Sequence, residues 1–241
     1  VDFEIDMGLF SIDFTIAGIE AEIALTAASA NAALTVTAAG FSFSGSIAWS
    51  WGAPPVIATQ IGSTLRLNMG VDAPHMGDIY KDLQDDSYTI THIGGAAGYE
   101  TIRVQSLGVD KTYSGISKIV VNDGDQGFDF IYVAPNVLAD VEINGGNRND
   151  TFYIVGSGDH TVNGNGGDDQ IETGAGNDTI RGGSGTNSLR GGPGDDTFVW
   201  DGGIDDTVEG QAGNDTFIVT GGSGTIDGGT GEDVFEITSG E

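Results

Sequence analysis

A nine-residue period in the C-terminal part of the sequence constrains the fold of this chain more than any other feature. In the stretch GAGNDTIRGGSGTNSLRGGPGDDTFV, residues 174–199, an acidic or amide residue recurs at Asp178, Asn187 and Asp196. A large apolar residue follows two positions after each of them. Side chains on a strand alternate between its two faces, so a short strand can place that apolar residue inward. Glycines suit the intervening turns because they adopt positive φ without strain.

The repeat follows the pattern G-G-x-G-x-D-x-U-x, where U is a large apolar residue, and it occurs ten times between about residues 145 and 236. The U positions are Phe152, Val162, Ile171, Ile180, Leu189, Phe198, Val208, Phe217, Ile226 and Phe235. Two units make one coil of about 18 residues, and coils stack at about 4.8 Å, the spacing of paired strands. The sequence therefore predicts an all-β fold, a right-handed parallel β-roll (a β-solenoid) preceded by an irregular strand-rich segment.

The D positions of this repeat separate into two columns on opposite edges of the coil. One column is His160, Asp178, Asp196, Asp215 and Asp233, and the other is Asp150, Asp169, Asn187, Asp206 and Gly224. Two carboxylates about 5 Å apart at an effective dielectric near 20 repel by about 3 kcal/mol, which a divalent cation between turns would reverse. A single aspartate is more simply a turn cap, but seven in register favour a metal.

Calcium suits such a ladder because it takes six to eight oxygen ligands, including backbone carbonyls. The expected metal ligands are Asp150, Asp169, Asp178, Asn187, Asp196, Asp206, Asp215 and Asp233. We expect several calcium ions. We also expect Asp196, with an aspartate on either side in its column, to matter more than Asp150, which begins its column.

The composition supports a hard cation and excludes several partners. The chain carries 36 acidic and 8 basic residues, a formal net charge of −28, so nucleic acid is not expected as a partner. Such a charge fits either a disordered acidic segment or a folded protein with bound metal, and the periodic apolar residues favour the second. There is no cysteine, which removes thiolate ligands. No apolar run is long enough for a transmembrane helix.

Three regions are expected along the chain. Residues 1–55 read as a β-strand-rich segment of unclear role, with strand favoured over helix in the Ala-rich part (residues 21–39) and GAPP (52–55) as a turn or linker. Residues 56–118 read as a transitional β and loop region, with candidate strands at 87–93 and 100–107. Residues 119–241 are assigned to the β-roll, regular from about 145. The chain starts with Val1 rather than Met, so we expect a piece of a longer protein.

The repeats GNGGDDQIE, TGAGNDTIR, GGPGDDTFV and GQAGNDTFI resemble the RTX (repeats-in-toxin) nonapeptides, also called hemolysin-type calcium-binding repeats. The resemblance implies a parallel β-roll with calcium in its turns, secretion from a bacterium, and folding triggered by external calcium. Three places depart from the pattern: Arg148 replaces a turn glycine, His160 replaces an aspartate, and the repeat around Ile226 is eroded.

The sequence predicts a calcium-binding structural module of a large secreted or cell-surface bacterial protein: a spacer, an adhesin stalk, or a surface-layer or filament component. The alternative is an accessory calcium-dependent domain of a secreted enzyme or toxin whose catalytic part lies elsewhere. We expect no enzymatic activity, since the chain has no H-E-x-x-H and no G-x-S-x-G motif. Self-assembly, a cell-surface or carbohydrate partner and ice binding are weaker alternatives. The histidines, His75, His92 and His160, are expected at the surface, and the tryptophans in a core or interface.

Overall fold

The computed structural model of the chain describes residues 56–69, 86–122 and 127–238, together with the backbone of five strands within residues 1–53. The chain divides into two compact units, residues 1–53 and 54–241. Every regular element in the described part is a β-strand. The described residues contain no helix with the length and apolar character that a membrane span requires.

The first unit contains antiparallel strands. Strands β1 (Phe3–Asp6), β2 (Ser11–Ile16) and β3 (Ile19–Ala24) form one sheet, and β4 (Asn31–Ala38) pairs with β5 (Phe41–Ala48). The preference for strand over helix in the Ala-rich part is therefore confirmed where that part is described. The GAPP segment, His75, and the side chains of Trp49 and Trp51 lie outside the described residues.

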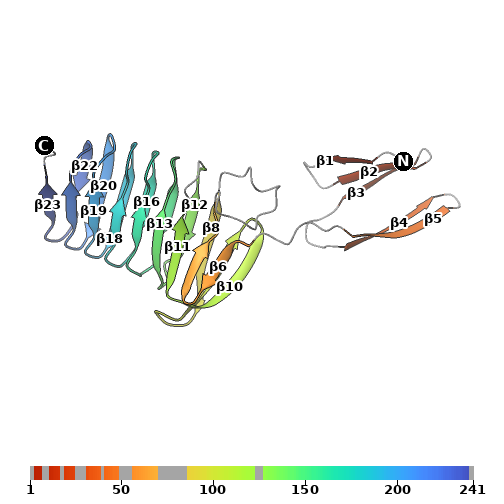
Figure 1. The fold of residues 1–241 in the computed structure, drawn as a ribbon, viewed down its shortest axis with the longest axis horizontal. Helices are drawn as coiled ribbons and strands as arrows, with labels where there is room; N and C mark the ends of the chain where they lie inside the picture. The colour runs from red at the N-terminus through yellow and green to blue at the C-terminus, as the bar shows by residue number, and fades with distance from the viewer. Residues whose placement is uncertain are drawn as a thin grey trace. The chain divides into compact units, whose positions relative to one another are not determined.

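In the second unit, the described residues form two sheets of nine strands each. Figure 1 shows the strands following one another along the solenoid. The first sheet runs in the order β10 (Val109–Ile116), β9 (Glu100–Ser106), β8 (Ser87–Gly94), β12 (Phe130–Val133), β14 (Thr151–Ile154), β16 (Gln170–Thr173), β18 (Ser188–Pro193), β20 (Asp206–Ala212) and β22 (Gly224–Asp227). The second runs in the order β23 (Val234–Ile237), β21 (Thr216–Val219), β19 (Thr197–Trp200), β17 (Thr179–Arg181), β15 (Thr161–Asn163), β13 (Asp140–Asn144), β11 (Lys118–Asn122), β7 (Thr64–Leu67) and β6 (Ala58–Ile61). Strands 87–93 and 100–107 were expected and correspond to β8 and β9.

From β11 onward the chain alternates between the two sheets, and each strand pairs in parallel with the strand one coil away. The apolar U residues stack in register, as in the pairs Ile180↔Phe198 and Phe198↔Phe217. The rings of Phe198 and Phe217 lie 5.0 Å apart and nearly parallel. U residues of the inner coils are at most 2% exposed, so they form a thin continuous core. The predicted parallel β-solenoid is confirmed.

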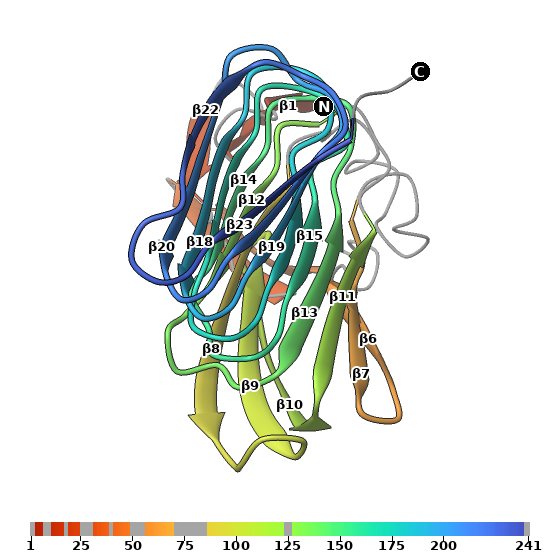
Figure 2. The same cartoon turned by 90° about the vertical axis from the view of Figure 1, so that its left-hand side faces the viewer.

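The N-terminal end of the solenoid is closed by antiparallel strands. Strand β6 pairs antiparallel with β7, and β9 pairs antiparallel with both β8 and β10. Figure 2, which looks along the stack, shows these hairpins reaching beyond the coils. Strand β9 turns Glu100, Ile102 and Val104 inward, each fully buried. We call residues 56–69 and 86–116 the cap; its strands β7 and β8 are the first to join the parallel ladders.

Candidate metal-binding columns

Two columns of polar side chains, buried except for Asp233 at the C-terminal end, run along the two edges where the chain turns between the sheets. Each member lies two residues before an inward apolar residue of the following strand, so the strand register aligns the members. The long column is Asp86, Asp129, Asp150, Asp169, Asn187 and Asp206, all at most 2% exposed. The short column is His160, Asp178, Asp196, Asp215 and Asp233. The columns predicted from the nine-residue step are therefore present, and they contain all eight predicted metal ligands.

In every aspartate of the two columns after Asp86, one carboxylate oxygen is used in a hydrogen-bonded ladder. In the short column, the backbone amide of Asp178 donates to Oδ1 of Asp196 at 2.9 Å, and the amide of Asp196 donates to Oδ1 of Asp215 at 2.9 Å. In the long column, the amide of Asp150 donates to Oδ1 of Asp169 at 2.9 Å. These bonds satisfy backbone donors that would otherwise be buried without a partner, and they fix the orientation of each carboxyl group.

The second oxygen has no such partner in several of these residues. The Oδ2 atoms of Asp169, Asp178, Asp196 and Asp215 are buried and accept no hydrogen bond from the described residues. Burial raises the pKa of Asp169 to about 7, of Asp178 to about 6 and of Asp196 to about 7. An unpaired buried carboxylate is costly, so each such group must bind a proton or meet a cation.

Glycines leave room around these oxygens. A Cβ atom on Gly191 would overlap Oδ2 of Asp196, and a Cβ atom on Gly210 would overlap Oδ2 of Asp215. A Cβ atom on Gly194, which has a φ of +149°, would overlap the carbonyl oxygen of Gly176 in the stacked turn. Glycine is therefore required here both for the backbone conformation and for the close approach of successive turns.

This donor set fits a hard divalent cation held mainly by oxygen. Among the described residues, no three His, Cys, Asp or Glu side chains gather as a metal cluster, because each turn contributes one carboxylate and the next lies a full coil away. Any ion between turns would therefore take one or two carboxylates and complete its shell with backbone carbonyls. Calcium accepts such mixed oxygen shells, whereas Zn²⁺ prefers four nitrogen or sulfur ligands.

A family model described as "RTX calcium-binding nonapeptide repeat (4 copies)" matches residues 155–198 and 200–235. The chain carries RTX calcium-binding repeats. RTX repeats bind Ca²⁺, several ions across successive repeats. They form a structural calcium-binding fold and are typical of proteins that bacteria secrete. Searches of curated proteins and of solved structures find no match.

The long column extends beyond the matched RTX repeats. The amide of Asp129 donates to Oδ1 of Asp150 at 2.9 Å, and the amide of Asp86 donates to Oδ1 of Asp129 at 2.6 Å. The expectation that Asp150 begins its column is therefore wrong. Sequence reasoning missed both residues because the strict glycine pattern fails there. The signal that could have found them is an aspartate two residues before a buried apolar residue, Tyr88 after Asp86 and Ile131 after Asp129.

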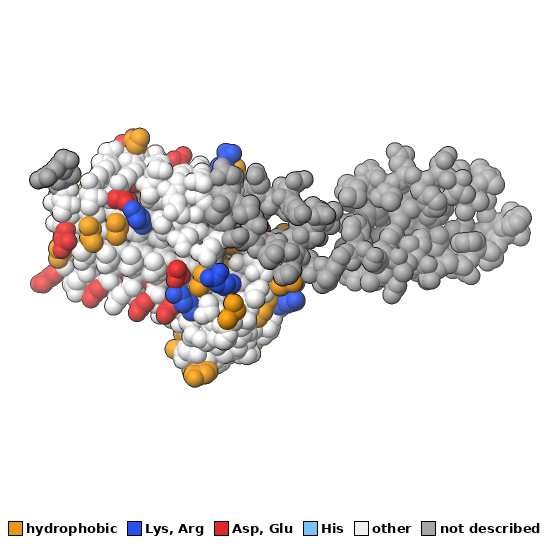
Figure 3. All heavy atoms as spheres, viewed as in Figure 1, with side chains coloured by type: hydrophobic (Ala, Val, Ile, Leu, Met, Phe, Trp, Pro, Cys, Tyr) orange, Lys and Arg blue, Asp and Glu red, His pale blue; other side chains and the backbone are white. Residues whose placement is uncertain are grey.

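A second, exposed ladder runs beside the short column of the RTX repeats. Oδ1 of Asp159 accepts the amide of Asn177, Oδ1 of Asn177 accepts that of Asp195, and Oδ1 of Asp195 accepts that of Asn214. Asp and Asn alternate in this ladder without changing its geometry, so it requires a side-chain oxygen but not a charge. Figure 3 shows acidic side chains spaced along one border of the repeats.

Two of the three histidines depart from the expected surface placement. His160 is 1% exposed, and burial lowers its pKa to about 4. The His92 side chain is 21% exposed and lies 2.6 Å from the fully buried Glu100. The absence of a zinc-type spacing in the sequence says nothing about whether a histidine is buried between strands, so it could not predict these positions. Trp200 is 8% exposed and belongs to the interior.

Proposed function

We propose that the chain is a calcium-binding structural module of a large secreted or cell-surface bacterial protein, which Ca²⁺ folds and stiffens. The observation that carries this proposal is the set of buried aspartates whose second oxygen faces a glycine-lined turn without a partner. The ligand side chains are the eight predicted ones, Asp150, Asp169, Asp178, Asn187, Asp196, Asp206, Asp215 and Asp233. Bound calcium neutralises their charge and links successive turns.

The decisive experiment compares two adjacent aspartates of one turn. Asp196 is buried with Oδ2 unpartnered, whereas Asp195 is exposed and only accepts the amide of Asn214. Asp196→Asn should weaken calcium binding about tenfold or more, which is 1.4 kcal/mol or more, because the amide keeps the hydrogen bond from Asp178 and loses the charge. Asp195→Asn should leave the affinity unchanged, since Asn177 and Asn214 already do the same task in neighbouring turns.

Isothermal titration calorimetry of both variants provides the measurement. Equal losses in the two variants would mean that only the total negative charge matters, and the assignment of the inner column would fail. Affinities in the range of about 10⁻⁴–10⁻³ M are typical of extracellular calcium modules, and a value there would fit an extracellular location. Magnesium should substitute poorly, because it demands near-octahedral geometry at shorter distances.

A spacer or stalk is the role that we propose within the parent protein. The rung-to-rung hydrogen bonds and both columns run along the same axis, so calcium between turns resists extension along it. Single-molecule pulling of the module should give a higher unfolding force in calcium than in chelator. The alternative, an accessory domain of a secreted enzyme or toxin, predicts instead that calcium on this module changes the activity of a linked catalytic domain.

A further inference from the structure

The inner position of the short column changes its chemistry along the stack. In the N-terminal coils this position is occupied by Leu65, Ile119 and Val141, which pair in register and are at most 1% exposed. His160 comes next, and the aspartates follow from Asp178 onward. The long column shows no such change, because Asp86 and Asp129 continue it into the cap. In the N-terminal coils the short column therefore has apolar side chains in place of carboxylates, whereas the long column keeps its carboxylates.

His160 stands at the point of change, and its hydrogen bonds define its state. Its Nδ1 accepts the amide of Val141 at 3.2 Å, and its own amide donates to Oδ1 of Asp178 at 2.7 Å. A ring nitrogen that accepts an N–H bond carries no proton, so the ring is neutral and its proton lies on Nε2. Nε2 is buried without a partner and lies against Gly156. This turn thus presents an N–H donor where the following turns present a carboxylate oxygen.

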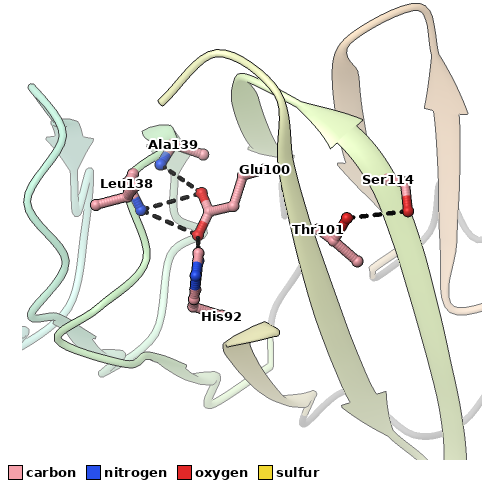
Figure 4. Close-up of polar contacts among 6 residues, drawn as sticks. All are labelled: His92, Glu100, Thr101, Ser114, Leu138 and Ala139. Carbon is pink, nitrogen blue, oxygen red and sulfur yellow. Dashed lines mark hydrogen bonds and ion pairs between the residues drawn. The ribbon is translucent and has the colours of Figure 1, made fainter. Parts of the chain in front are cut away.

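The turn one coil before that of His160, residues 134–139, also has protein groups where a metal would otherwise be needed. Glu100 is fully buried, and its Oε2 accepts the amides of Leu138 at 3.0 Å and Ala139 at 2.9 Å. Its Oε1 accepts the amide of Leu138 at 3.2 Å and lies 2.6 Å from Nδ1 of His92. Figure 4 shows these contacts. Both oxygens of this carboxylate are therefore occupied by protein donors, unlike those of Asp196. Glu100, from the cap, accepts the backbone amides of the turn before β13, and His160, from the first repeat, accepts the amide of Val141 within β13.

We propose that the calcium sites of the short column begin at Asp178, and that the turns of residues 134–139 and 155–160 are metal-free, closed by Glu100 and His160. This inference rests on the proposed calcium function and deepens it. It makes the two edges unequal in the number of ions that they hold. It also gives the solenoid an N-terminal part that is packed on this edge before calcium arrives, on which the calcium-dependent turns can stack.

The first test is the stoichiometry of calcium binding by the full chain. His160→Asp places a carboxylate in register with Asp178 and should add one calcium ion per chain in isothermal titration. Asn163→Asp on the same strand β15 introduces the same charge on the outward face and should add none. An unchanged stoichiometry in a folded His160→Asp variant would overturn the inference. A wild-type chain that binds no calcium would instead refute the proposed function.

The second test needs no variant that could misfold. Hydrogen exchange of the wild-type chain is measured in calcium and after chelation. The amides of Leu138, Ala139 and Val141, which donate to Glu100 and His160, should stay protected within about tenfold. The amide of Asp178, which donates to Asp196, should lose protection by about a hundredfold or more. Loss of protection at both groups together would show that the N-terminal turns also depend on calcium and would overturn the inference.

Discussion

Val141 and Asp196 lie at the same inner position of the same column, three coils apart, yet their coils are held in different ways. Val141 is 1% exposed among apolar neighbours, and the amides around it find side-chain acceptors in Glu100 and His160. Asp196 is as deeply buried but keeps one oxygen without a protein partner. The strands of both coils pair in parallel register with those of the neighbouring coils. On the proposed assignment of the ligands, parallel stacking does not itself require calcium, and one buried carboxylate per turn creates the requirement.

The largest expected effect is a separate response of the two regions to calcium. An ion that binds only the native state adds about 2.7 kcal/mol when its free concentration is a hundredfold above Kd, so two ions add about 5 kcal/mol. Scanning calorimetry should therefore show a repeat transition that moves to higher temperature with calcium and a cap transition that moves little. A single transition that shifts as a whole would mean that cap and repeats unfold as one cooperative unit.

Removing Glu100 should damage the cap without altering calcium binding. Glu100→Ala leaves the buried amide of Ala139 and the partly buried amide of Leu138 without an acceptor, and each unsatisfied buried donor costs about 1–3 kcal/mol. We expect a loss of about 3 kcal/mol or more in the free energy of unfolding of the cap, measured by urea denaturation, that calcium does not restore.

The matched control for Glu100 is another carboxylate in the same sheet. Asp110 pairs with Arg103 at the surface, where both side chains are 43% exposed. Asp110→Ala should change the free energy of unfolding much less than Glu100→Ala, because exposed ion pairs contribute little. If the two variants were equally stable, the Glu100 contacts would not be what closes the N-terminal turns.

A glycine substitution tests how tightly the repeat turns stack. Gly194→Ala meets the carbonyl oxygen of Gly176 in the neighbouring turn, so its cost should exceed the strain of a left-handed residue alone, about 1–2 kcal/mol. Gly115→Ala in strand β10 also has positive φ (+76°), but a Cβ atom there meets nothing within 4 Å. Thermal unfolding in calcium should rank Gly194→Ala well below Gly115→Ala, and equal stability would argue against close turn packing.

The regular repeats could be predicted from the sequence because each of them has the same short pattern of glycines, an aspartate or asparagine, and an apolar residue. The position of Asp178 relative to Ile180, and of Asp196 relative to Phe198, specifies strand, turn and column together. The nine-residue step then separates the two edges without any knowledge of long-range contacts. The stacked phenylalanines and the pairing of every second repeat follow from the same rule.

The cap could not be predicted in this way because its contacts join residues that are far apart and follow no period. Glu100 accepts the amide of Leu138, which lies 38 residues away in the sequence. No local pattern around either residue predicts this hydrogen bond. His160 reads as a degraded repeat, although its ring is buried and hydrogen-bonded to Val141. Asp129 was missed because recognising its turn depends on aligning Ile131 with Phe152, a register that only the sheet reveals.

The smallest expected effect is a pH dependence whose sign calcium reverses. In the metal-free chain the pKa of Asp169 and Asp196 is raised from 3.8 to about 7 by burial. The native state then binds more protons than the unfolded state between about pH 4 and pH 7, so this contribution to stability is lost as pH rises through that window. Burial lowers the pKa of His160 to about 4. Between about pH 4 and pH 6.5 the unfolded state therefore binds more protons at this residue, so its contribution to stability rises with pH and offsets part of the loss from the aspartates.

In calcium the sign reverses, because the ion requires deprotonated carboxylates and competes with protons for them. The melting temperature of the repeats should fall from pH 5 to pH 8 in chelator, and should rise over the same interval in calcium. The cap, held by hydrogen bonds and apolar packing, should follow neither trend closely. Parallel pH profiles with and without calcium would mean that the buried aspartates are not what the ion neutralises, and the difference between Val141 and Asp196 would lose its proposed consequence.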